Sequence, residues 1–301
     1  MPLAKARTCL LVYLSTNNSS TCLLVYLSTN NSSTCLLVYS STCLLVYLST
    51  RLLVYSSTIM RLVKKIIRWV IALFLASTIL AVVAYRFIPV YFTPLMFIRA
   101  LETRSVTMHH HWIPLEEMSP HMPVAVMAGE DARFLLHHGF DYDAIGKAAK
   151  RNLTSKGGKK YGASTISQQT AKNVFLWPGR SWVRKGFEVY FTALIEMTWS
   201  KQRIMEVYLN SVEMGDRIYG IDAVAEQNFG KKACDMTRSE CALVAATLPN
   251  PHIYSSKNPS SYTRKRQRAI ANNMRYIPTF PKEGEDYDPK TAVGGVYHSS
   301  K

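Results

Sequence analysis

The stretch Ser200–Asn210, "SKQRIMEVYLN", decides the fold class. Ser200 precedes the apolar positions and can cap a helix, because its side-chain oxygen accepts a hydrogen bond from the backbone of the first turn. Ile204, Val207 and Tyr208 follow at helical spacing and are expected to face inward together. The stretch therefore predicts a buried α-helix, and with it a domain that consists mainly of helices.

Three more helices are expected upstream. Asp143 can cap "AIGKAAKRNL" and Ser164 can cap "TISQQTAKNVFL", and the basic, glycine-containing stretch 154–163 between them is expected to be a flexible loop. A helix over Trp182–Trp199 follows. Its expected core stripe consists of Val183, Phe187, Tyr190, Leu194 and Met197.

Downstream, the segment 219–251 predicts two short helices that end at Gly230 and Pro249. Cys234 and Cys241 are seven residues apart and fit two turns of one helix face, so packing thiols are favoured and a disulfide is left open. No strong series of alternating apolar residues appears in this region, which again predicts a mainly α fold.

The composition limits the class of partner. The chain has 301 residues, of which 48% are hydrophobic, and a formal net charge of +16. This is enough for one sizeable core or two small ones. The charge favours an anionic partner, either nucleic acid, acidic lipid or a phosphate-bearing substrate, against the alternative of a basic surface with no particular partner.

Residues 1–59 form a repetitive N-terminal extension. The unit "TCLLVYLSTNNSS" occurs twice and is followed by shortened copies. Each copy carries an apolar, β-prone run with almost no charge, a pattern closer to an aggregation-prone segment than to a domain. Met60 begins a stretch that is typical of a true N-terminus. We therefore interpret residues 1–59 as an upstream extension whose start codon is mis-assigned.

Residues 60–86 are expected to form a single transmembrane anchor. The run Trp69–Tyr85 contains 17 uncharged residues, longer than most signal-peptide cores of about 7–15 residues, which are the alternative. At about 1.5 Å per residue the run crosses most of a bilayer core of roughly 30 Å. Its N-terminal side carries Arg61, Lys64, Lys65 and Arg68, so the N-terminus is expected inside the cytoplasm and the rest outside.

Residues 87–123 are expected to be a juxtamembrane collar. The stretch is apolar and aromatic, but prolines interrupt it too often for a second span. His109, His110 and His111 could bind a metal, yet consecutive residues do not share a helix face. A solvated linker is therefore favoured over a metal site.

The stretch "GEDARFLLHHG", residues 129–139, places Glu130 and Asp131 directly after an apolar run. These acids are either a solvated helix end or part of an active site. Thr165, Gln169 and Lys172 can form a polar stripe suited to a sugar and a phosphate, and a solvent-exposed helix face is the alternative.

Five motifs occur in order: "EDARFLLHHG", "GASTISQQTAKN", "RKGFE", "KQRIMEVYLN" and "YGIDAVAEQNFG". Together they resemble the peptidoglycan glycosyltransferase domain (glycosyltransferase family 51), found in class A penicillin-binding proteins and in monofunctional biosynthetic peptidoglycan transglycosylases. The resemblance covers about residues 112–277, plus the anchor. It implies a mainly α, lysozyme-like glycosyltransferase domain, placed here at 124–277, with a membrane-embedded collar at the mouth of the cleft.

The resemblance also implies roles for individual residues. Glu130 matches the catalytic base. Glu188 matches an acid that helps to handle the lipid pyrophosphate, with a divalent cation (Mg or Mn) as a candidate cofactor. The matches to substrate-binding positions are Asp131, Phe134, His138, Thr165, Gln169, Lys172, Asn173, Arg184 and Lys185.

The fourth motif contributes Glu206, Tyr208 and Asn210, whose implied role is more structural than chemical. One position departs from the family pattern: Ala132 stands where the family usually has Arg, and Arg133 follows it.

The implied reaction polymerises lipid II into glycan strands. The 4-hydroxyl of an acceptor GlcNAc attacks C1 of a lipid-linked MurNAc with inversion, and undecaprenyl pyrophosphate leaves. A sugar hydroxyl is a poor nucleophile, so a carboxylate must remove its proton, and an apolar segment behind Glu130 can raise its pKa toward the working pH. Lys172, Arg184 and Lys185 can stabilise the negative charge that develops on the pyrophosphate.

Two rival functions remain. A lysozyme-like hydrolase also uses two carboxylates, but it would cleave glycan. A non-catalytic membrane scaffold for wall synthesis would leave the clustered charges unexplained. Neither S-x-x-K nor K-T-G occurs, so a transpeptidase domain is not expected.

The expected partners are lipid II, the growing glycan strand and membrane lipid at the inner membrane, with cell-wall synthesis proteins as further candidates. The basic stretch 264–268, "RKRQR", resembles a nucleic-acid patch. Because this stretch is expected outside the cytoplasm, nucleic acid is not predicted as a partner. Residues 278–301 are rich in Pro and Gly and are expected to be a disordered tail.

Overall fold

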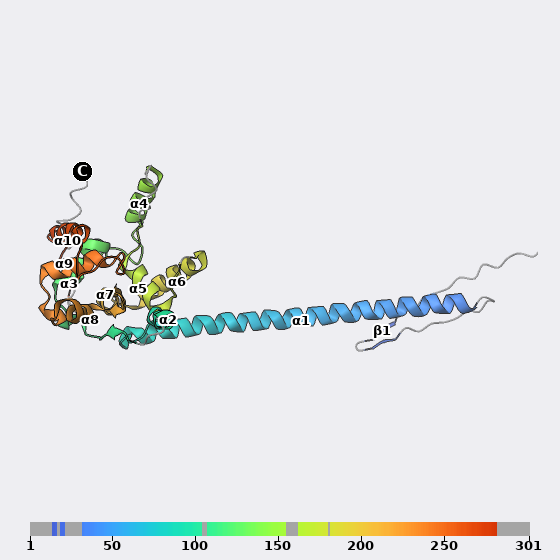
Figure 1. Ribbon diagram of the computed structural model, residues 1–301. Coiled ribbons are helices and arrows are strands. Elements are labelled where there is room, and N and C mark those ends of the chain that lie inside the picture. The colour runs from blue at the N-terminus through green and yellow to red at the C-terminus, as the bar shows by residue number, and fades with distance from the viewer. Residues whose placement is uncertain are drawn as a thin grey trace, which may run out of the picture. The chain divides into compact units, whose positions relative to one another are not determined.

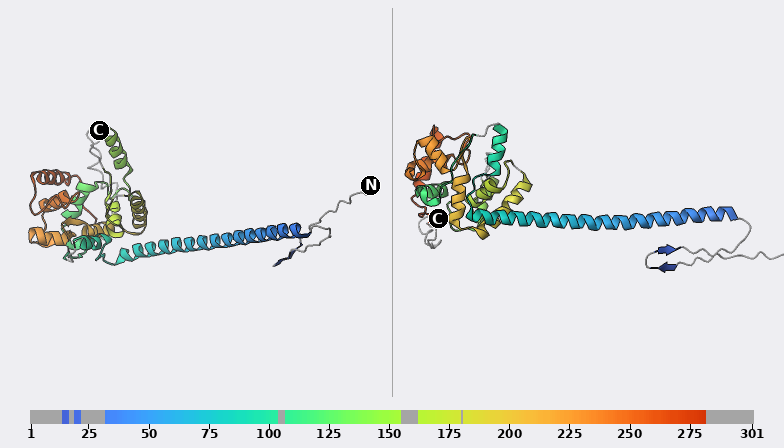
Figure 2. Two further views of the ribbon diagram at one scale, coloured as in Figure 1. Left: turned by 45° about the vertical axis from the view of Figure 1, so that its right-hand side comes forward. Right: turned by 90° about the horizontal axis from the view of Figure 1, so that it is seen from below.

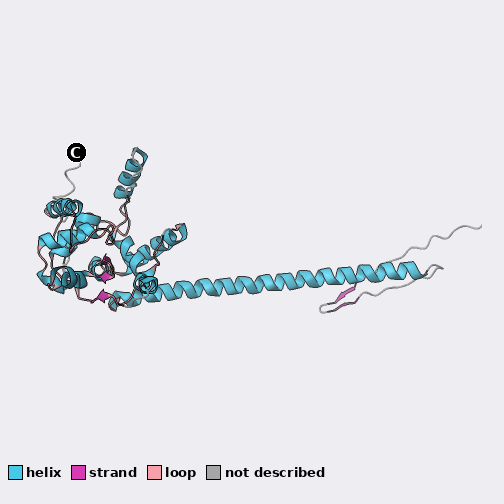
Figure 3. Cartoon of the chain, viewed as in Figure 1, coloured by secondary structure: helices cyan, strands magenta, loops and turns pink. Residues whose placement is uncertain are grey.

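The computed structural model describes residues 14–16, 19–21, 32–103, 107–154, 162–179 and 181–281. The chain divides into two compact units, Met1–Leu75 and Ala76–Lys301. Helices predominate over strands throughout the described parts (Figure 3). This confirms the prediction of a mainly α protein.

The first unit contains a short hairpin and the beginning of a long helix. Strands β1 (Leu14–Thr16) and β2 (Ser19–Thr21) pair antiparallel, and helix α1 runs over Ser32–Phe87. The "LLVY" runs from Thr34 onward are therefore helical, although their composition is β-prone. Strand propensity depends strongly on context, whereas leucine is a good helix former, and adding residues to an existing helix is easier than starting one.

Helix α1 includes the predicted anchor. In the described part of the chain it is the one helix that is long and apolar enough to cross a membrane, and by length and composition this stretch is Val46–Phe87. The stretch contains the whole expected run Trp69–Tyr85 and extends well beyond it toward the N-terminus.

The last turns of α1, from Ala76 onward, belong to the second unit and pack against its other helices. The Thr78 hydroxyl lies 2.8 Å from the Tyr190 hydroxyl, and Trp199 Nε1 donates to the carbonyl of Val82 at 2.8 Å. Arg203 donates to the carbonyl of Tyr85, also at 2.8 Å. This end of α1 is thus joined to the helical domain by hydrogen bonds as well as by apolar packing.

The second unit consists of helices around one core, shown in two further views in Figure 2. Helix α3 packs against α9 and α10, and α5 packs against α6 and α7. Helix α4 projects from the rest and buries none of its residues (Figure 1). The bounds are α2 Pro94–Thr103, α3 His121–Glu130, α4 Tyr142–Thr154, α5 Ile166–Phe175, α6 Trp182–Thr198, α7 Lys201–Ser211, α8 Ile221–Val224, α9 Arg238–Thr247 and α10 Ser261–Asn273.

Single helical turns and a small sheet complete the unit. The turns are 3-10 helices at Leu115–Glu117 and Ala233–Asp235 and a π-helical turn at Ala225–Phe229. Strand β5 (Ile218–Tyr219) lies between β3 (His109–His110), with which it is parallel, and β4 (Glu213–Gly215), with which it is antiparallel. The expected linker at the three histidines is thus partly a strand, and the His110 ring hydrogen-bonds the carbonyl of Asn210.

Helix α7 confirms the prediction from "SKQRIMEVYLN". Ser200 caps it by accepting a hydrogen bond from the backbone of Arg203. Ile204, Val207 and Tyr208 are all 0% exposed. The amphipathic pattern therefore identified both the element and its buried face.

Two predicted helix caps were wrong by one or two residues. Thr165, not Ser164, caps α5 in a reciprocal capping box with Gln168. The carboxylate of Asp141, not Asp143, accepts from the backbone N–H of Ala144 at the start of α4. The capping box needs Glu or Gln three residues after the cap, and Thr165 meets this requirement whereas Ser164 does not.

The predicted core stripe of α6 was right in its middle, where Phe187, Tyr190 and Leu194 pack partly buried against the core, and wrong at its two ends. Val183 and Met197 are 67% and 73% exposed. The buried face instead carries Glu188, Phe191 and Ile195, together with Thr192. Apolar residues occur on more than one side of this helix, and the packing of α5 decides which side is covered.

The cysteines do not share a helix. Cys234 lies exposed in the 3-10 turn, Cys241 is buried in α9, and both are free thiols. The single-face prediction was therefore wrong, and these two residues form no disulfide. The predicted loop at 155–161 and the tail from 282 onward lie outside the described residues.

Candidate active site

Glu130 is the last residue of α3, a helix whose residues from Met122 to Met127 are all buried. Its side chain is 14% exposed. Gln169 Nε2 donates to Glu130 Oε2 at 3.0 Å, and Arg266 Nη2 lies 3.3 Å from Glu130 Oε1. The Glu130 carboxylate at the end of this apolar helix is therefore in contact with Gln169 of α5 and Arg266 of α10.

A third helix reaches this carboxylate through Gln169. The buried hydroxyl of Tyr208 on α7 donates to Gln169 Oε1 at 3.2 Å. The amide of Gln169 therefore bridges Tyr208 and Glu130.

The surroundings tune Glu130 for proton transfer. Burial raises the pKa of Glu130 above its ordinary value, while the hydrogen bond from Gln169 and the charges of Arg266 and Lys172 lower it. Burial is the largest effect, so the net change is upward. A carboxylate whose pKa moves toward neutrality is a better general base than an exposed one.

Asp131, next to Glu130, faces the protein instead of open space. Its carboxylate accepts from the backbone N–H of Ile166 at 3.0 Å and lies 2.9 Å from His137 Nε2. Both side chains are nearly buried. Asp131 thereby ties the end of α3 to the start of α5, which sets the distance between Glu130 and Gln169.

Three other predicted site residues, Phe134, Thr165 and His138, differ in how deeply they are buried. Phe134 is 0% exposed and lies in the core. Thr165 is buried as the cap of α5, and its hydroxyl donates to the carbonyl of Gly139 at 2.7 Å. Gly139 has a φ of +88°, and a Cβ there would lie 2.9 Å from the Thr192 side chain. His138 is exposed. Thr165 thus joins the first two motifs, Phe134 packs in the core, and a substrate contact by His138 stays a prediction.

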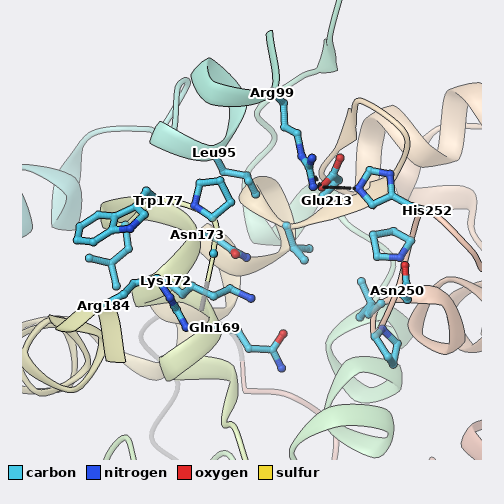
Figure 4. Close-up of a pocket in the computed structure, with 17 residues that line it drawn as sticks. Leu95, Arg99, Gln169, Lys172, Asn173, Trp177, Arg184, Glu213, Asn250 and His252 are labelled. Carbon is cyan, nitrogen blue, oxygen red and sulfur yellow. Dashed lines mark hydrogen bonds and ion pairs between the residues drawn. The ribbon is translucent and has the colours of Figure 1, made fainter. Parts of the chain in front are cut away.

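A cavity of about 400 Å³ lies beside Gln169. Figure 4 shows Gln169, Lys172 and Asn173 extending from α5 toward it, with Arg184 nearby. Leu95 of α2 and Trp177 add apolar walls. The cavity therefore combines cations, amides and apolar surface, as a lipid-linked phosphosugar requires.

Glu188 organises the cations of this cavity. Arg184 Nη1 lies 3.0 Å from Glu188 Oε2, and Lys185 Nζ pairs with Glu188 Oε1. The Glu188 and Arg184 side chains are only 4% and 12% exposed. Arg184 and Glu188 thus form a mostly buried ion pair.

Lys172 is the cation closest in sequence to Gln169. Its side chain is open to solvent in the cavity. The surrounding protein nevertheless removes much of its hydration, and this desolvation lowers the pKa of Lys172. Glu188 opposes the change, and the neighbouring Arg184 adds to it. The cavity thus keeps Lys172 and Arg184 close together, and the carboxylates of Glu188 and Glu130 partly offset the mutual repulsion of these cations.

The donor set does not fit a protein-built metal site at Glu188. Both of its oxygens already bind cationic side chains. Among the described residues, no group of three or more His, Cys, Asp or Glu side chains is arranged to hold a metal ion. We therefore derive no step through a divalent cation.

Sequence reasoning missed four polar residues. Arg266 lies in the stretch 264–268, which had been weighed only as a nucleic-acid patch. Arg99, Glu213 and His252 line the cavity across from Lys172, and His252 Nε2 lies 3.3 Å from Glu213 Oε2 (Figure 4). These residues come from α2, β4, the loop after α9 and α10, and no motif spacing connects those segments.

The fold and this site together define a glycosyl-transferring domain of the lysozyme-like class. A family model described as Transglycosylase matches residues 98–275, and the chain belongs to this family.

Curated relatives with the name biosynthetic peptidoglycan transglycosylase agree with this. The protein from Bacteroides thetaiotaomicron is 55% identical over 226 residues, which is 73% of this chain and 90% of the relative. The protein from Bdellovibrio bacteriovorus is 49% identical over 225 residues, 72% of this chain and 88% of the relative. The one from Caulobacter vibrioides is 50% identical over 214 residues, 70% of this chain and 92% of the relative.

Proposed function

We propose that this protein is a peptidoglycan glycosyltransferase that polymerises lipid II into β-1,4-linked glycan strands and releases undecaprenyl pyrophosphate. The observation that carries the proposal is the position of Glu130. A carboxylate with a raised pKa stands at the end of an apolar helix, one hydrogen bond from Gln169, which also lines a cationic cavity.

Glu130 acts as the general base. It takes the proton of the acceptor 4-hydroxyl while the hydroxyl oxygen forms a bond to C1 of the donor sugar. The bond from C1 to the pyrophosphate oxygen breaks at the same time, and its electron pair leaves with the pyrophosphate. Attack from the face opposite the leaving group inverts C1.

The cations of the cavity receive the leaving group. Lys172 and Arg184 line the space beside Gln169, so the pyrophosphate would lie next to the base but not on it. Preorganised cations stabilise charge that develops in the transition state. Glu188 holds Arg184 and Lys185 in place, which gives this acid a positioning role instead of proton transfer.

The apolar helix supports a reaction at a membrane. The stretch Val46–Phe87 is long and apolar enough to span one. Arg61, Lys64, Lys65 and Arg68 precede the apolar run and Arg86 follows it. This asymmetry supports an N-terminus inside the cytoplasm and a catalytic domain outside it.

No described feature favours the hydrolase alternative. A glycoside hydrolase of the lysozyme type needs a second carboxylate across the scissile bond. Asp131 is the acid adjacent to Glu130, and its oxygens already bind Ile166 and His137.

The test is Glu130→Gln in a gel assay of glycan products from purified lipid II. We expect polymerisation to fall by at least about 10²-fold, as for loss of a general base. Loss of glycan cleavage instead would indicate a hydrolase. Unchanged polymerisation would refute the role given to Glu130.

A further inference from the structure

Gln169 has a choice of two orientations. A glutamine amide carries one acceptor oxygen and one NH₂ group of nearly equal size, so a flip exchanges them at little steric cost. In one orientation the NH₂ group donates to Glu130. In the other the amide oxygen faces the carboxylate, which is repulsive. The reaction therefore depends on what fixes this amide.

Tyr208 favours one of the two orientations of the Gln169 amide. Its side chain is 0% exposed, and its hydroxyl donates to Gln169 Oε1 at 3.2 Å. Burial, with a smaller effect of the Glu130 and Asp131 charges, raises the pKa of Tyr208 far above its ordinary value. The phenol therefore keeps its proton at every working pH and presents a hydrogen-bond donor to the amide oxygen.

We propose that Tyr208 is a positioning residue for the general base: its hydroxyl donates to the amide oxygen of Gln169 and so favours the orientation in which the NH₂ group faces Glu130. The proposal rests on Glu130 being the base. It goes beyond the implied structural role of the fourth motif, because it assigns Tyr208 a hydroxyl-dependent effect on catalysis that packing alone does not supply.

The consequence is electrostatic. The bond from Gln169 lowers the pKa of Glu130 and opposes the larger upward effect of burial. When the amide is free to flip, its oxygen can accept a hydrogen bond from the protonated carboxyl group, which stabilises the neutral acid, so the pKa of Glu130 rises. The carboxylate is then protonated at pH values where the wild-type base is ionised.

The contact also joins three helices at one point. Glu130 ends α3, Gln169 lies in α5 and Tyr208 lies in α7. Gln169 Nε2 lies 3.0 Å from Glu130 Oε2, and the Tyr208 hydroxyl lies 3.2 Å from Gln169 Oε1. The aromatic ring of Tyr208 fills core volume, but only its oxygen reaches Gln169, so a phenylalanine at this position separates the two contributions.

The experiment is the pH profile of kcat/KM for Tyr208→Phe in the full-length, detergent-solubilised protein with lipid II. The acidic limb reports the pKa of the base in the free enzyme. We expect this limb to move to higher pH by up to about one unit, the size of a lost neutral hydrogen bond. Activity should recover toward wild type at high pH.

Gln169→Ala completes a double-mutant cycle. On its own it should move the limb in the same direction, and adding Tyr208→Phe to it should cause no further movement, because the hydroxyl acts only through the amide. The matched control is Tyr219→Phe. Tyr219 is also 0% exposed, and within the described residues its hydroxyl has no hydrogen-bond partner. This change should leave the limb in place.

The outcomes separate the two proposals. If Tyr208→Phe folds and leaves the acidic limb unmoved, or if its shift adds fully to that of Gln169→Ala, the positioning role is overturned while Glu130 can still be the base. If Glu130→Gln polymerises lipid II normally, the function assigned to Glu130 fails first.

Discussion

Arg266 Nη2 lies 3.3 Å from Glu130 Oε1, although 136 residues separate them in the chain. Arg266 projects from α10 and Glu130 ends α3, and these two helices pack against each other. The Glu130 carboxylate therefore has a cation on one side and an amide on the other. Both lower its pKa and so oppose the larger upward effect of burial.

Removing the charge at Arg266 should weaken the base at low pH. Arg266→Gln takes away one of the groups that lower the pKa of Glu130. The acidic limb of kcat/KM should move upward by about half a unit to one unit, with little change at high pH. The measurement is a pH series of lipid II polymerisation rates.

Arg268→Gln is the matched control, because Arg268 lies exposed on the same helix. It should leave the limb where it is. Equal shifts in the two variants would mean that general surface charge, and not the contact with Glu130, sets the pKa.

Glu130→Gln should abolish activity without lowering stability. The folded-state pKa of Glu130 is raised above 4.5, so its contribution to stability is present at low pH and is lost as pH rises through the folded pKa. At pH 7 the ionised carboxylate thus destabilises the fold, and glutamine removes this effect. We expect an equal or higher Tm at pH 7.

The thermal measurement should be repeated near pH 4, where the difference between wild type and variant should shrink. A Tm of Glu130→Gln well below that of the wild type at pH 7 would contradict this argument and would call for another explanation of lost activity.

Lys172 should set the alkaline limb. Its pKa is lowered from 10.5, and it must carry its proton to stabilise the departing pyrophosphate, so activity should fall as pH rises through that lowered value. Lys172→Gln should cost about 10²–10³-fold in kcat. Lys172→Arg retains the charge and should shift the alkaline limb to higher pH, which a rate series above pH 8 would reveal.

Glu188→Ala should damage both stability and turnover. It leaves the buried Arg184 without its partner, and breaking a buried pair costs about 3–5 kcal/mol. Calorimetry should show a lower Tm, and the glycan assay a lower kcat. Titration with Mg²⁺ gives the decisive comparison: a divalent-ion dependence that the wild type has and Glu188→Ala lacks would favour metal binding over the positioning role.

The helical class was predictable because it depends on local periodicity. In "SKQRIMEVYLN" the cap and the apolar spacing both indicate one helix face, and α7 buries that face. In α6 the pattern was ambiguous, since Val183 and Phe191 lie on different sides of the helix. Only the packing of α5 determines that Phe191 is buried and Val183 is exposed.

The candidate site was predictable in part. The motifs identified Glu130, Gln169, Lys172, Arg184 and Glu188. Gln169, Lys172 and Arg184 line the cavity. Glu130 contacts Gln169, and Glu188 contacts Arg184. The motifs could not separate residues that line the cavity from residues that hold its walls. A motif indicates which residues belong to the site, whereas their burial in the fold shows whether they line the cavity or support its walls.

The sequence by itself determined the helical class, the apolar anchor segment and the acid at the end of α3, because periodicity, hydropathy and order along the chain are local properties. Only the tertiary structure brings Arg266 to that acid and Tyr208 to Gln169, which hydrogen-bonds it. Their contacts join α10, α7, α5 and α3. Side chains from segments so far apart meet only where the helices pack, and the strength of a charge or hydrogen bond depends on the burial that packing creates.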